Sequence, residues 1–60
     1  MTRDEAINEA GRIHAYFPFR LIAIARGPGS DNWEVIAGRT MARFNNLARK
    51  GYTVNMCKWG

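Results

Sequence analysis

The most restrictive feature of this sequence is a pair of strand-like segments, residues 19–26 and 33–37, with apolar side chains on both faces. Gly27, Pro28 and Gly29 lie between them and predict a chain reversal. A sheet that is apolar on both faces needs two covers, and a chain of 60 residues has little material for them. An apolar surface left uncovered usually marks contact with another molecule.

Few of the devices that stabilise small domains are open to this chain. Cys57 is its only cysteine, so an internal disulfide is excluded. Even with His14, the only histidine, Cys57 falls short of the usual four-ligand zinc site. We therefore expect one domain over residues 1–60, with no metal and no cofactor. Self-association or binding to a larger protein is the remaining source of stability.

The compartment is inferred from the same cysteine and from hydropathy. An unpaired thiol is typical of a reducing cytoplasm. No segment approaches the roughly 20 apolar residues that a membrane-spanning helix needs. The first residues are polar and lack a hydrophobic signal core. We expect a soluble, cytoplasmic protein.

The first helix is marked at both ends. Thr2 and Glu5 form a capping box, in which each side chain accepts a hydrogen bond from the other residue's backbone N–H. Pro18 pushes the residue before it out of helical geometry, so the helix should end by Tyr16 or earlier. Between these limits, apolar residues recur at three- and four-residue spacing and predict one buried face. They are Ala6, Ile7, Ala10 and Ile13, and Phe17 continues the spacing.

The remaining elements follow from turn and capping signals. A second helix is expected from about residue 40 to residue 49, with Thr40 as its cap and Gly51 as its stop. Residues 52–59 alternate in polarity and predict a last strand. The expected fold class is α+β, a small single domain in the order helix-strand-strand-helix-strand. Its three-stranded antiparallel sheet should have the order 2-1-3 and both helices on one face, with 1-2-3 as the alternative order.

Alternation along the strands divides their side chains into two sets. One set is almost wholly apolar and is assigned to the helix-covered core: Phe19, Leu21, Ala23, Ala25, Trp33, Val35, Ala37, Tyr52, Val54 and Met56. The other has an apolar centre with charged ends, which we interpret as a protein interface. The set comprises Arg20, Ile22, Ile24, Arg26, Glu34, Ile36, Thr53, Asn55, Cys57 and Trp59. The predicted interface consists of Ile22, Ile24 and Ile36, with Arg20, Arg26 and Trp59 around them. The alternative is that these isoleucines are ordinary exposed residues on a solvated face.

Charge is distributed unevenly along the chain. From residue 35 to residue 60 there are five basic residues and no acidic one, within a net charge of +4. On the second helix, residues at spacings of four, seven and eleven form a basic stripe suited to nucleic acid or an acidic protein. The stripe consists of Arg39, Arg43, Asn46 and Lys50, with Arg49 and Lys58 as extensions. The alternative is a solvated helix face.

Catalytic chemistry has little support in the sequence. Ser30, Asp31 and His14 are the only ingredients for a hydrolytic triad, and nothing in their spacing brings them together. The glycine-rich cluster opens onto a strand, whereas phosphate-binding loops open onto a helix N-terminus. We expect no catalytic residues and no small-molecule substrate.

Two functional hypotheses remain. The leading one is a small non-enzymatic protein-interaction module, either a homodimer or an inhibitor-like protein that binds through the isoleucine face or a free sheet edge. The alternative is a nucleic-acid-binding protein that uses the basic stripe. The length and element order are of a kind found among small accessory proteins of phages and mobile elements, a general likeness that no motif carries.

Overall fold

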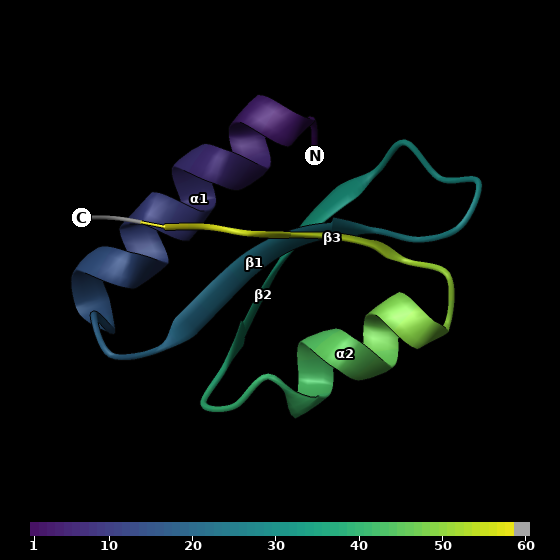
Figure 1. The fold of residues 1–60 in the computed structure, drawn as a ribbon. Coiled ribbons are helices and arrows are strands. Elements are labelled where there is room, and N and C mark those ends of the chain that lie inside the picture. The colour runs from purple at the N-terminus through teal and green to yellow at the C-terminus, as the bar shows by residue number, and fades with distance from the viewer. Residues whose placement is uncertain (59–60) are drawn as a thin grey trace.

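The order of elements is helix, strand, strand, helix, strand, which confirms the expected α+β class (Figure 1). The structure, a computed structural model, describes residues 1–58. Its elements are α1 (Arg3–Tyr16), β1 (Leu21–Arg26), β2 (Trp33–Gly38), α2 (Ala42–Arg49) and β3 (Thr53–Met56). The strands form one antiparallel sheet in the order β2-β1-β3, as predicted.

Helix α1 begins and ends where the sequence predicts. The Glu5 backbone N–H donates to Thr2 Oγ1 at 3.2 Å, and the Thr2 N–H donates to Glu5 Oε1 at 2.8 Å, so the capping box is complete. These hydrogen bonds lower the pKa of the Glu5 carboxyl, because they favour its charged form. The helix ends at Tyr16, two residues before Pro18.

Helix α2 begins later than the sequence predicts. It starts at Ala42 after Met41, and no side chain caps it, so the expectation that Thr40 is the cap is wrong. Near this start, the Phe44 ring packs over Gly38, 3.6 Å from the position that a Cβ would occupy on that glycine. The C-terminal signal is confirmed, since Gly51 has φ +93° and its N–H donates to Ala48 O at 3.1 Å.

The last strand is shorter than expected. β3 covers four residues, Thr53–Met56, where the alternation predicted residues 52–59. The prediction for Trp59 lies outside the described residues.

The register between β1 and β2 corrects the two predicted side-chain sets. Ile22 pairs with Ala37, Ile24 with Val35, and Arg26 with Trp33. Directly opposed residues of an antiparallel pair share a face. The isoleucines of β1 therefore lie on the same face as Trp33, where the sequence reading had placed them on opposite faces.

This shared face is the main core, and α1 covers it. Ile22 and Ile24 are each only 1% exposed and cluster with Ala6 and Ala10 of α1 and with Trp33. The prediction that Ile22 and Ile24 form an exposed interface is therefore wrong. The small alanines let the helix approach the strand closely, so the larger isoleucine side chains fill the space between them.

The other face of the sheet is covered by α2. Phe44, which is 1% exposed, lies over Gly38, and Gly38 pairs with Leu21 on the face opposite to Ile22. The two helices thus lie on opposite faces, which corrects the expectation that they share one (Figure 1). Ala23 and Ala25 are also buried, so β1 is covered on both sides.

The stability loss on replacing Ile24, compared with that on replacing Phe19, tests which of these residues belongs to the core. We expect Ile24→Ala to lower the free energy of unfolding by about 2–5 kcal/mol, because it opens a cavity under α1. Phe19→Ala, at a side chain that is 99% exposed, should change it by less than about 0.5 kcal/mol. Urea denaturation followed by circular dichroism measures both. Equal stability losses would contradict the assignment.

Candidate functional site

The connection between α1 and β1 exposes three aromatic side chains to solvent. Phe19 is 99% exposed, Tyr16 79% and Phe17 53%. We call residues 16–20 the aromatic loop. The sequence reading placed Phe19 in the core, and that prediction is wrong because β1 starts only at Leu21.

The aromatic loop has a defined local conformation. The Phe17 N–H donates to Ile13 O at 2.8 Å, and the Arg20 N–H donates to Phe17 O at 3.1 Å. The Arg20 guanidinium lies 5.3 Å from the centre of the Phe17 ring, a cation–π contact. Pro18 further restricts the backbone between them. Bonds within and next to the loop therefore order its backbone, and the cation–π contact orders the Phe17 ring.

The aromatic loop shares one end of the sheet with other exposed groups. Leu21 pairs with Gly38, so the loop lies beside the β2–α2 connection, residues 39–41. The Cys57 N–H donates to Ile22 O at 2.9 Å, which brings Lys58 to the same end. We call the aromatic loop, residues 39–41 and Lys58 together the aromatic end.

The aromatic end is basic. Arg20, Arg39 and Lys58 are exposed there, and Met41 is 43% exposed. None of the segments that form this end contains a carboxylate residue. The acidic side chains lie on α1 and in the 31–34 region, and they are Asp4, Glu5, Glu9, Asp31 and Glu34.

The structure does not bring the predicted protein-interface residues together. Ile22 and Ile24 are buried under α1, and Ile36 is half-buried on the opposite face. Arg26 is engaged by Asp31, at 3.5 Å, and by the Trp33 ring, at 5.3 Å. Of the members of this set within residues 1–58, Arg20 alone lies at the aromatic end.

The predicted basic stripe is only partly a helix face. Arg39 precedes α2, and Arg43 Nη1 donates to Ala37 O at 3.4 Å, at the edge of β2. Asn46, Arg49 and Lys50 are exposed on α2 or directly after it. Binding of nucleic acid or of an acidic partner by these residues stays a prediction.

The outer edge of β2 is occupied at both ends. The Trp33 N–H donates to Met1 O at 2.9 Å, and the Met1 ammonium donates to Asn32 Oδ1. At the other end, Arg43 donates to Ala37 O. Only the backbone around Val35 remains between them, because alternate residues of a strand present their N–H and C=O groups to the same side. Such blocking protects an edge against strand addition.

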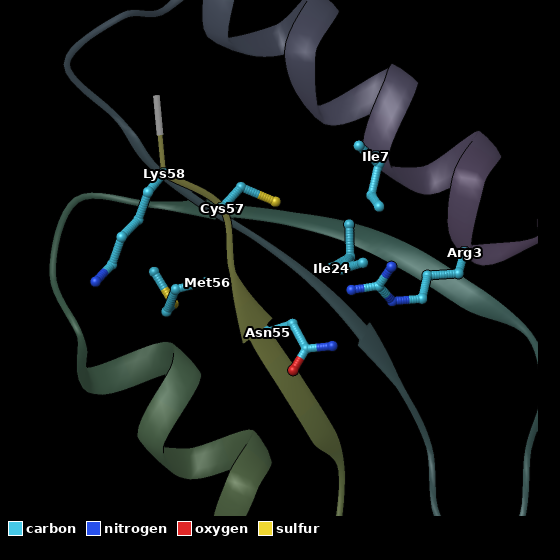
Figure 2. A pocket seen from close by; sticks show the side chains of 7 residues that line it. All are labelled: Arg3, Ile7, Ile24, Asn55, Met56, Cys57 and Lys58. Atoms are coloured by element: carbon cyan, nitrogen blue, oxygen red, sulfur yellow. The ribbon is translucent and has the colours of Figure 1, made fainter. Parts of the chain in front are cut away.

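A pocket of about 210 Å³ lies between α1 and β3 (Figure 2). Its lining residues are Arg3, Ile7, Ile24, Asn55, Met56, Cys57 and Lys58. In Figure 2, Arg3 reaches from α1 toward Asn55 and Ile24, while Lys58 extends away from it. The sequence reading missed this site, because Arg3 and Asn55 lie far apart in the chain and carry no joint motif.

A second hollow, of about 290 Å³, lies at the end of the sheet remote from the aromatic loop. The 27–31 turn, Arg26, Gly51 and Thr53 line it. Its walls are mainly polar, so it offers little to an apolar side chain.

Cys57 is half-buried and has a free thiol. Burial raises the pKa of this thiol, and the Ile24 backbone and the positive charge of Arg3 offset part of that rise. The neutral thiol is therefore favoured in the folded protein, which makes Cys57 a weak nucleophile.

Comparison with known proteins leaves the function open. No family model, no curated protein and no solved structure matches the chain. Within residues 1–58, no helix is long and apolar enough to cross a membrane. Over the same residues, no three His, Cys, Asp or Glu side chains gather in a metal-binding arrangement.

The raised pKa of Cys57 predicts a pH dependence. Folding should shift the alkylation profile of this thiol to higher pH than in the urea-denatured chain. The folded state then binds more protons between the two pKa values, so the free energy of unfolding should fall as pH rises through that window. Rates of iodoacetamide alkylation against pH test this. A folded-state profile at or below the denatured one would contradict it.

Proposed function

We propose that this protein is a small, non-enzymatic protein-interaction module that binds a partner through its aromatic end. The observation that supports this most is Phe19, which is 99% exposed and follows two further exposed aromatics, Tyr16 and Phe17. Aromatic residues and arginine are enriched where protein interfaces have their largest binding energies. The free thiol of Cys57 fits a reducing compartment such as the cytoplasm.

The energetics favour such a contact. Burying a Phe side chain contributes about 1.5–3 kcal/mol before the costs of association. The hydrogen bond from Arg20 to Phe17 O and the cation–π contact order the loop before binding. A loop that is already ordered loses less conformational entropy on binding, so more of the burial energy remains as affinity.

The partner's chemistry follows from the surroundings of the loop. Phe19 projects beside Arg20, and Arg39 and Lys58 lie at the same end of the sheet. A complementary surface would have an apolar pocket with an acidic rim. The two hollows described above within residues 1–58 do not fit that description, because Arg3 and Lys58 line one and polar groups line the other. We therefore favour a different protein over a second copy.

Loss of the exposed ring should abolish partner binding without unfolding the protein. Tagged wild-type protein should capture a partner from a nuclease-treated lysate of its source cells, and Phe19→Ser should not. With the purified partner, calorimetry should show the dissociation constant of Phe19→Ser raised by about tenfold or more, since hot-spot side chains contribute about 2 kcal/mol or more.

Arg49→Gln is the matched control, since Arg49 is exposed at the end of α2, close to Gly51 and the second hollow, remote from the aromatic loop. It should bind as the wild type does. The proposal fails if Phe19→Ser captures the same protein with unchanged affinity. If the wild-type chain sediments as a dimer and Phe19→Ser sediments as a monomer, the partner is a second copy of the chain rather than a different protein.

Nucleic-acid binding is the second candidate function. Residues 35–60 contain no acidic side chain, and Arg49 and Lys50 are exposed at the end of α2. Within residues 1–58, the ion pairs involve Arg12 and Arg26, so Arg49 and Lys50 form no ion pair there. Opposing this candidate, Arg43 is already bonded to the β2 backbone and Arg39 lies outside the helix.

A gel shift with a short single strand and a short duplex tests this candidate. If the basic face binds nucleic acid, a shifted band at about 50 mM salt should weaken steeply by about 200 mM salt. Arg49→Glu should abolish it, whereas Arg12→Glu, with the same change in charge, should not. No shift at low salt would exclude this function.

A further inference from the structure

We propose that the α1/β3 pocket binds the carboxylate end of a short aliphatic chain. The site is separate from the aromatic end and does not depend on the function proposed above. It combines a cavity, apolar walls and two polar groups that converge from different elements (Figure 2). Convergent polar groups in an apolar pocket are the usual form of a small-ligand site.

The pocket exists because α1 leaves one strand uncovered. This helix packs across β1 and β2, and the flank of β3 beside it stays open. Ile7 on α1 is 39% exposed as a result, and Figure 2 shows its side chain pointing toward Ile24 of the sheet. Ile7 supplies the exposed part of this apolar wall, and Ile24, which is 1% exposed, forms its buried base.

The polar side of the pocket is formed by Arg3 and Asn55. In Figure 2 the Arg3 guanidinium reaches across the opening to the side where Asn55 lies. Within residues 1–58, the side chains of both residues lack a hydrogen-bond partner, and Arg3 forms no ion pair. The nearby Glu5 carboxylate is already engaged by the Thr2 backbone. A guanidinium and an amide that are both free to donate suit a carboxylate.

The positive charge of the residues that line the pocket favours an anionic ligand. Arg3 and Lys58 are positive, and no Asp or Glu among the described residues 1–58 lines the pocket. Lys58 extends away from Arg3, so it contributes to the local potential rather than to the head-group contact. Arg3 is therefore the residue that would hold the anionic group.

The volume and the apolar wall of the pocket restrict the class of ligand further. The volume of about 210 Å³ is below the roughly 300–1,000 Å³ of pockets for drug-sized ligands. The exposed Ile7 side chain would contact an alkyl chain, while a free phosphate would leave that side chain exposed to water. A planar carboxylate also matches the fork of one guanidinium, with Asn55 as an additional donor.

We choose hexanoate as the probe for ligand binding to the pocket. Hexanol, which has the same chain length but no charge, is the control ligand. We expect hexanoate to shift the backbone amide NMR signals of Arg3, Asn55 and Cys57 saturably. Hexanol should bind about tenfold more weakly or worse, because it lacks the charge-assisted hydrogen bonds. Arg3→Gln should weaken hexanoate binding by about tenfold, and Arg12→Gln on the same helix should leave it unchanged.

Cys57 supplies an independent readout. Its thiolate attacks iodoacetamide, so that a carbon–sulfur bond forms and iodide leaves. Bound hexanoate should slow this alkylation by occupying the pocket beside the sulfur, and the same concentration of hexanol should not. In Arg3→Gln, hexanoate should lose this protection.

A second variant guards against a folding defect in Arg3→Gln. Asn55→Ala leaves α1 intact and should weaken hexanoate binding severalfold, and circular dichroism shows whether each variant folds. A peptide with a free C-terminal Leu, compared with its amide, distinguishes two sources of the carboxylate. If the free peptide binds more tightly than hexanoate, the ligand is a chain terminus; otherwise it is a small free acid.

Three results would overturn the proposal. They are a hexanoate titration without saturation, equal hexanoate affinity in wild type and in folded Arg3→Gln, and inorganic phosphate shifting the same amides as strongly as hexanoate. Phe19→Ser should bind hexanoate normally, so failure of the aromatic end as an interaction site would be seen separately.

Discussion

The fold depends on the burial of β1 from both sides. Ile22 and Ile24 lie under α1, and Ala23 and Ala25 face the side that α2 covers. A central strand covered on both faces excludes water from its backbone hydrogen bonds as well as from its side chains. In so short a chain, this requirement places one helix on each face.

Covering both faces leaves other surfaces of the molecule bare. Helix α2 has only eight residues, and α1 packs on β1 and β2 rather than on β3. Within residues 1–58, no further helix or strand covers the aromatic loop or the flank of β3. Phe19 and Ile7 are consequently exposed, although both are residues that usually pack inside a protein.

The two proposed contact sites have opposite shapes and similar charge. The aromatic end projects rings beside cations, while the α1/β3 pocket is hollow and has Arg3 at its opening. Both therefore select acidic ligands, the first with an apolar pocket and the second with an apolar chain. The edge of β2 has neither role, because Met1 and Arg43 occupy it.

The sequence by itself determined the local elements and their order. The capping box at Thr2, the stop at Pro18 and the left-handed Gly51 act over a few residues, so they can be recognised without the fold. The strand order also followed, from general rules for chain connections. Only the tertiary structure decided which faces are buried, because a shift of one residue in the β1–β2 register exchanges every side chain between faces. For the same reason, only the tertiary structure shows that Ile24 is buried and Phe19 exposed. It also places Arg3 and Asn55, which are far apart in the chain, in the lining of one pocket.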